Sequence, residues 1–246
     1  MSPKPKLLRL LISISLLGLF STGAAHAEWV EADSLRVPRA RSATALLPSG
    51  QVLAIGGYSG WPRADVEIWD PARGSWSDAA PLERWRNGHT ATVLHSGKVL
   101  VVAGRDRAVY LKSTEIYDPA TDSWSLGGDL SQDVNLHSST LLLDGRVLVT
   151  GGANGEAVFD QVAIYDPGVS GSEPRWDEGP PMPTARHSHT ATLLEDGRVL
   201  VVGGCVQVLE YNNTCGDRTS SVELYDPSSG EWQSKAPLPA PVSDHP

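Results

Sequence analysis

The sequence is poor in cysteine and in the motifs of common catalytic sites. Its two cysteines, Cys205 and Cys215, have no histidine close to them in the sequence. Two sulfurs alone make an incomplete zinc site. No P-loop, dinucleotide fingerprint, zinc motif or Ser-His-Asp pattern occurs. These absences remove the commonest nucleotide-binding and hydrolase classes and predict no catalytic residues.

Long apolar runs are missing as well, except near the start of the chain. Lys4, Lys6 and Arg9 precede an apolar segment at 10–20, and Ala25-His26-Ala27 follows it. This pattern is typical of a secretory signal peptide and is too short for a membrane span. We therefore expect residues 1–27 to be removed near Ala27-Glu28. The mature chain would be secreted or periplasmic, without a membrane span.

Basic residues are scarce. The chain has 20 Lys and Arg against 29 Asp and Glu, and loss of the three in the signal leaves 17 against 29, a net charge of about −12. Such a surface repels phosphate backbones, which makes nucleic acid an improbable partner. In an exported protein Cys205 and Cys215 are expected to form a disulfide, with two free thiols as the alternative.

What the sequence does contain is a fifteen-residue segment that occurs four times. Each copy is an apolar run, a Ser-Gly or Asp-Gly pair, a Val-Leu-rich run and a small-Gly pair, which predicts a hairpin whose second strand is buried on both faces. Asp-Gly favours a turn with positive φ at both central residues. The copies are ATALLPSGQVLAIGG (43–57), TATVLHSGKVLVVAG (90–104), SSTLLLDGRVLVTGG (138–152) and TATLLEDGRVLVVGG (190–204).

Each copy is followed by an aromatic-Asp-Pro and then a tryptophan. Asp-Pro opens a turn after a third strand, and the tryptophan lies in a fourth. Each unit is thus a four-stranded antiparallel meander that must pack on its neighbours to bury both faces. The aromatic-Asp-Pro segments are 69–71, 117–119, 165–167 and 225–227, and the tryptophans that follow them are Trp76, Trp124, Trp176 and Trp232. A fifth tryptophan at the same spacing, Trp29, precedes the first copy.

This combination of glycine pair, aromatic and tryptophan resembles the kelch repeat of exported bacterial proteins, with a distant likeness to the central domain of galactose oxidase. Ala103 in place of a glycine and Trp69 in place of a tyrosine depart from the pattern. The resemblance implies an all-β propeller with four complete blades, open or partial, in a fragment of a longer product. The expected divisions are an orphan outer strand at 28–35, blades at 36–82, 83–130, 131–182 and 183–238, and the start of a truncated fifth at 239–246.

The topology places two kinds of loop on one side of such an array, which we call face A. Face A carries the loops between the second and third strands and the connections between blades, and it is where binding is expected. Exposed aromatics among Arg and Asn suit a sugar or a protein. The candidate ligand-binding residues in these loops are Tyr58, Trp61, Arg63, Arg105, Arg107, Tyr110, Tyr211, Asn212 and Arg218.

Two residue types recur with the blade. The histidines His89, His137 and His189, with His245, could form a metal-binding ring, but their repetition favours a blade-to-blade hydrogen bond. The arginines Arg39, Arg86 and Arg186 could hold a ligand carboxylate or serve the blade itself. We expect a non-catalytic binding module for a protein or glycan, without a cofactor. The alternative is an exported carbohydrate-active enzyme, either a galactose-oxidase-like copper oxidase or a sialic-acid mutarotase-like isomerase.

Overall fold

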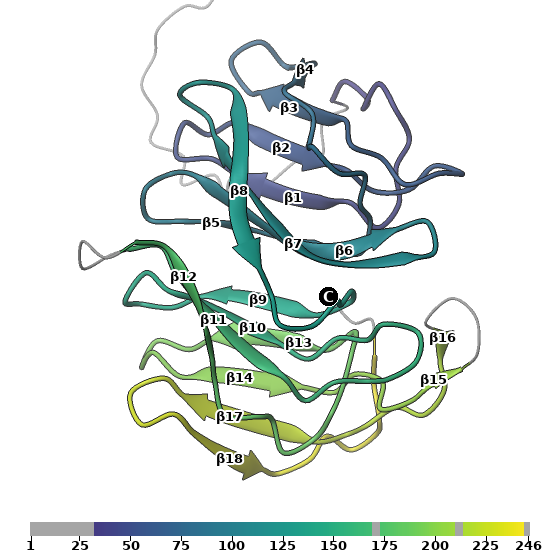
Figure 1. Cartoon of the computed structure of the whole chain (residues 1–246), viewed down its shortest axis with the longest axis vertical. Coiled ribbons are helices and arrows are strands. Elements are labelled where there is room, and N and C mark those ends of the chain that lie inside the picture. Colours follow the sequence, from purple (N-terminus) through teal and green to yellow (C-terminus); the bar gives the residue numbers. More distant parts are fainter. Residues whose placement is uncertain (1–31, 169–172, 210–213, 244–246) are drawn as a thin grey trace, which may run out of the picture. The chain divides into compact units, whose positions relative to one another are not determined.

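The structure is a computed structural model that describes residues 32–168, 173–209 and 214–243. The expected signal peptide and Trp29 lie outside these ranges. Within them the protein is all β: four antiparallel four-stranded sheets and one short hairpin (Figure 1). Across the same ranges no helix is long and apolar enough to span a bilayer. The expected all-β class and four complete blades are confirmed.

Each sheet is one blade. Its second strand pairs with the first and the third, and its fourth pairs with the third. Blade 1 holds β1 (Ala43–Leu46), β2 (Val52–Ile55), β3 (Val66–Asp70) and β4 (Ser75–Ala79). Blade 2 holds β5 (Thr90–Val93), β6 (Val99–Asp106), β7 (Val109–Asp118) and β8 (Ser123–Asp129). Blade 3 holds β9 (Ser138–Leu141), β10 (Val147–Thr150), β11 (Val162–Asp166) and β12 (Arg175–Glu178). Blade 4 holds β13 (Thr190–Leu193), β14 (Val199–Val202), β17 (Val222–Asp226) and β18 (Glu231–Lys235), with the hairpin β15 (Val208–Leu209) and β16 (Thr214–Cys215) in its face-A loop.

The Ser-Gly and Asp-Gly pairs do form the first hairpin of each blade, but the expected turn type was wrong. In blade 4, the amide of Gly197 donates to the carbonyl of Leu194 at 3.0 Å, and the amide of Leu194 donates to the carbonyl of Arg198 at 2.8 Å. Gly197 has φ +85°, whereas Asp196 has an ordinary negative φ. This is a three-residue loop, a type I turn followed by a left-handed glycine. Asp196 stabilises it by accepting the amide of Arg198 at 3.1 Å.

The apolar second strands of the two inner blades, β6 and β10, are buried on both faces, as expected, because each lies between two neighbouring blades. On blade 4 the second strand β14 is buried at Val199 and Val201 and only partly buried at Leu200 and Val202. Alternate residues of β6 point in opposite directions: Val99 and Val101 pack with blade 1, while Leu100 and Val102 pack with blade 3. All four are fully buried. A third cluster joins blades 3 and 4 around Leu148 of β10 and strand β14. The core of the protein is therefore a series of inter-blade layers.

The rim tryptophans connect each blade to the preceding segment. The indole Nε1 of Trp124 donates to the Ala80 carbonyl at 2.7 Å, Trp176 to Gly127 at 3.1 Å, and Trp232 to Pro180 at 3.0 Å. Trp76 of blade 1 makes the same bond, at 3.1 Å, to the carbonyl of Asp33 in the lead-in segment. At the centre, β1 contacts β5, β5 contacts β9, and β9 contacts β13.

Candidate functional site

The most distinctive exposed group on face A is a stack of two tryptophans on one arginine. The Arg107 guanidinium carbon lies 5.5 Å from the ring centroid of Trp61 and 5.1 Å from that of Trp85. Trp61 is 65% exposed and Trp85 is 44% exposed. A guanidinium over an indole face is attracted by the ring quadrupole. We call these three residues the Trp–Arg stack.

Three separate segments bring the stack together. Trp61 comes from the loop between β2 and β3, and Trp85 comes from the connection between blades 1 and 2. Arg107 occupies the turn at the tip of the β6–β7 hairpin, which continues past the bulge after Val102 to Asp106 and Val109. Arg107 has φ +54°, a strained value for a residue with a side chain. Blade 2 thus carries an extended hairpin at the place where a loop between the second and third strands was expected.

Two adjoining clefts flank the stack and share Trp61, Pro62 and Arg107. The first, of about 520 Å³, has Tyr58 on its wall, with Arg41 and Arg105. The second, of about 430 Å³, is completed by Arg63, Asp65 and Trp85. These volumes lie in the range of small-ligand sites.

The arginines of the first cleft differ from most others in the protein because they have no acidic partner. Arg41, Arg105 and Arg107 make no ion pair with any described carboxylate, and the Nε of Arg105 is buried without a hydrogen-bond acceptor. Arg63, in the second cleft, is paired with Asp65 at 2.7 Å. In a protein with an excess of carboxylates, three unpaired guanidinium groups around one cleft create a local positive site.

The structure brings together four of the residues expected to bind ligand: Tyr58, Trp61, Arg105 and Arg107 line the first cleft. Tyr110 lies beside it, with its ring 5.1 Å from the Arg105 guanidinium. A Cβ on Gly155 of blade 3 would lie 2.7 Å from the Tyr110 hydroxyl, so this tyrosine also packs on the neighbouring blade.

Sequence reasoning missed Trp85 and Arg41. Both lie in the lead-in to a first strand, next to positions that are alike in most blades. Trp85 precedes Arg86, which recurs as Arg39 and Arg186, and Arg41 precedes Ser42, where the other blades have histidine. Neither recurs itself: the positions equivalent to Trp85 hold Pro38, Asp133 and Ala185. The available signal was that these two residues differ from those at the equivalent positions of the other blades. A residue that the blade itself does not require is free to contact a ligand.

The recurring arginines Arg39, Arg86 and Arg186 are placed inside their blades, not on the cleft walls. In blade 2, Arg86 Nη2 donates to Glu115 Oε1 at 2.5 Å, and Nη1 donates to the carbonyls of Ala103 at 2.7 Å and Ser113 at 3.0 Å. Burial lowers the pKa of Arg86, and the charge of Glu115 opposes that shift. The same pair forms between Arg39 and Glu67 and between Arg186 and Glu223. The carboxylate that these arginines hold is the blade's own.

The histidines lie between blades near the centre of the array. His137 Nε2 is 2.9 Å from Thr90 Oγ1 of blade 2, and His189 Nε2 is 2.9 Å from Thr150 Oγ1 of blade 3. For these two histidines this is the blade-to-blade hydrogen bond that their repetition predicted. His89 makes no such bond to a side chain of the neighbouring blade within the described ranges. Burial lowers the pKa of His89 and of His137 to about 3, with the nearby charge of Arg86 adding to the effect at His89. Within the described ranges no group of three or more His, Cys, Asp or Glu could hold a metal ion; His245 lies outside them.

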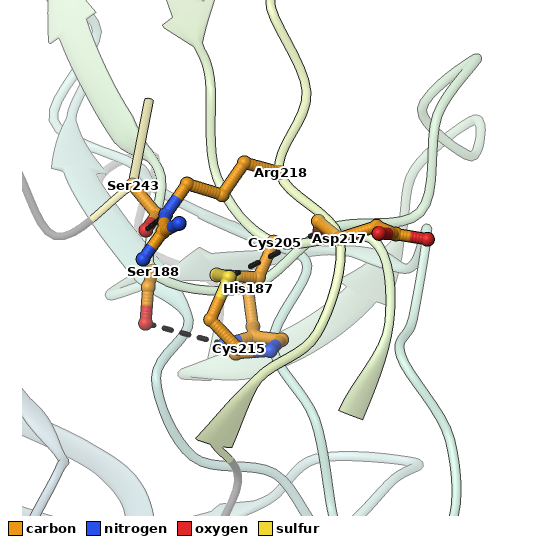
Figure 2. Close-up of a disulfide and its surroundings, with 7 residues drawn as sticks. All are labelled: His187, Ser188, Cys205, Cys215, Asp217, Arg218 and Ser243. Carbon is orange, nitrogen blue, oxygen red and sulfur yellow. Dashed lines mark hydrogen bonds between the residues drawn. A yellow bond between two sulfur atoms is a disulfide. The ribbon is translucent and has the colours of Figure 1, made fainter. Parts of the chain in front are cut away.

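The face-A loop of blade 4 is closed by the expected disulfide between Cys205 and Cys215 (Figure 2). Cys205 is fully buried and forms backbone bridges with His187 and Arg218. Arg218 Nε donates to Ser243 Oγ at 2.9 Å. Arg218 therefore lies away from the Trp–Arg stack and lines neither cleft. Two further candidates, Tyr211 and Asn212, fall outside the described residues.

Comparison with known families agrees with the repeat. The model of the Kelch motif matches residues 39–83, 86–131 and 186–239, more than half of the chain. The chain is a kelch-repeat protein. The family likeness extends to the human Kelch-like protein 6, which is 36% identical over 78 residues. That match covers 31% of this kelch chain and 12% of the human protein.

Solved structures show the same fold. YjhT superimposes on this kelch array with a TM-score of 0.73 at 16% identity, covering 90% of this chain and 78% of YjhT. A fungal alcohol oxidase of the AA5 family, in complex with copper, has a TM-score of 0.52 at 17% identity, covering 82% of this chain and 54% of the oxidase. At these identities the likeness establishes the kelch-type propeller architecture, and propellers carry unrelated activities.

Proposed function

We propose that this kelch protein is an exported, non-catalytic binding module that presents face A to a protein or glycan ligand. The observation that carries the proposal is the Trp–Arg stack, with Trp61 65% exposed beside a cleft of about 520 Å³. Exposed tryptophan and arginine are the residues most enriched at binding hot spots. Both tryptophans are held by stacking on Arg107, so little side-chain freedom is lost when a ligand binds.

Export is supported by two features. The first 27 residues have the pattern of a secretory signal, and the Cys205–Cys215 disulfide forms in the compartments that such signals lead to. The expected partners therefore lie outside the cytoplasm.

The binding role is tested by screening the purified protein on a glycan array and a peptide array, together with Trp61→Ala. A matched control is Leu143→Ala, since Leu143 is 64% exposed but lies on the first hairpin of blade 3, away from face A. We expect at least one ligand whose binding is lost with Trp61→Ala and kept with Leu143→Ala. Ligands that bind both variants equally would contradict a face-A site.

The copper-oxidase form of the enzyme alternative is separated by metal analysis. A copper oxidase retains about one copper per chain through purification, whereas a binding module does not. Stoichiometric copper, with turnover of a sugar alcohol group, would overturn the non-catalytic proposal.

A further inference from the structure

We infer that the first cleft of face A selects an acidic glycan, an oligosaccharide that carries carboxylates on its sugar rings. The inference rests on the proposed function and names the ligand class of the same site. It follows from three observations: unpaired arginines, exposed ring faces, and backbone groups that are already hydrogen-bonded.

The charge requirement comes from Arg41, Arg105 and Arg107. Each lines the first cleft, and none has a carboxylate partner among the described residues. Most of the other described arginines are paired, whether buried, as Arg86 is with Glu115, or exposed, as Arg198 is with Asp196. Among the described arginines, Arg84 and Arg218 are the two exceptions outside the cleft. The one acidic residue of the hairpin tip, Asp106, pairs with none of the three. A bound carboxylate would supply the missing partner through charge-assisted hydrogen bonds.

The ring requirement comes from the aromatic walls. Tyr58 is 45% exposed and Trp61 is 65% exposed, and both border the first cleft. Flat aromatic faces match the C–H face of a pyranose ring, and their polar atoms remain available to hydroxyl groups. Trp61 also lines the second cleft, so one oligosaccharide can contact this tryptophan from both clefts.

The backbone argues against an extended peptide as the ligand. Ala40 and Tyr58 exchange both of their backbone hydrogen bonds, at 2.9 and 2.8 Å, and Asn87 and Arg105 exchange theirs at 3.1 and 2.9 Å. The floor of the cleft thus presents no free strand edge to which a peptide could add. Recognition must come from side chains, which here are guanidinium groups and aromatic rings.

The test is calorimetric titration of the full chain with tetragalacturonate at low salt. Two comparison probes are the same tetramer as its methyl ester and a tetraglutamate peptide of equal charge. We expect the free-acid tetramer to bind at least tenfold more tightly than either probe, with affinity falling as salt rises. Arg107→Gln should weaken binding at least tenfold, and Arg73→Gln, the same change at an exposed turn outside the clefts, should leave it unchanged.

Each other outcome overturns the inference in a distinct way. Equal binding of the ester would show that carboxylates are not read. Equal or tighter binding of tetraglutamate would assign the site to acidic protein segments. No binding of the uronate tetramer would refute the ligand class, while the array experiment with Trp61→Ala would still report on the binding role itself. Matching melting curves for the two arginine variants ensure that a loss of binding is not a loss of folding.

Discussion

At the scale of single residues, the buried histidines give the protein a specific sensitivity to acid. In the folded state the pKa of His137 is about 3, because burial disfavours the charged ring, against an ordinary value of 6.5. Below pH 6.5 the unfolded chain takes up a proton that the folded chain does not. Stability is therefore complete above about pH 6.5 and is lost as the pH falls toward 3.

His137→Asn should reduce this dependence. The variant lacks the one proton that the unfolded parent binds at this ring and the folded parent does not. The slope of the unfolding free energy against pH should therefore fall by up to about 1.4 kcal/mol per pH unit. Urea unfolding of the parent and the variant at several pH values between 7 and 4 measures this slope. His95→Asn serves as the control, because His95 is exposed at the first hairpin of blade 2. The same slope in His137→Asn as in the parent would show that this ring does not stay neutral in the fold.

Residues that the repeat requires were predictable, and residues that it does not require were harder to place. The rim tryptophans and the buried second strands of the inner blades followed from spacing and residue type, and the disulfide followed from the expected export of the chain. Trp85 and Arg41 were missed because their role depends on the geometry between blades, where a loop of blade 1 meets the lead-in of blade 2 and a hairpin of blade 2. The order of residues within one repeat carries no information about contacts between loops of different blades.

At the scale of the blade, the structure explains a covariation that is visible in the sequence. Three blades hold a buried Arg–Glu pair, whereas blade 3 has Val134 and Ala163 at the same two positions, both packed in an apolar cluster. Both partners are replaced together, because either charge alone would be buried without compensation. The role of the arginines stayed open in the sequence because the glutamates that recur with them were not considered as their partners.

The pair in blade 2 should behave as a coupled unit. Arg86→Val alone leaves Glu115 buried and should cost about 3–5 kcal/mol, and Glu115→Ala alone should cost a similar amount. The double variant should cost at least about 1 kcal/mol less than the two single costs added together. It should not reach the parent, since Glu115 also accepts the amides of Glu83 at 2.7 Å and Arg84 at 3.2 Å. Additive costs in a denaturation cycle would show that the pair is not coupled.

At the scale of the whole array, each blade is stabilised by its neighbours, so the two end blades differ from the inner ones. Leu46 on the first strand of blade 1 is 66% exposed, while its counterparts Val93, Leu141 and Leu193 are partly buried. On blade 4 the other flank is the more open one: Leu200 is only partly buried. This pattern fits the open array that the sequence analysis expected.

One position tests this difference directly, because all four blades carry leucine there. Leu53, Leu100 and Leu148 are buried against the following blade, with exposures of 0%, 0% and 1%. Leu148→Ala should therefore cost about 2–5 kcal/mol, the usual range for a leucine truncated in a packed core. Leu200→Ala should cost clearly less, since a partly buried side chain loses fewer contacts and leaves a gap that water can fill. Chemical denaturation of both variants beside Leu100→Ala measures the series. Equal costs at Leu148 and Leu200 would mean that the outer flank of blade 4 is covered in solution, and the open array would then be wrong.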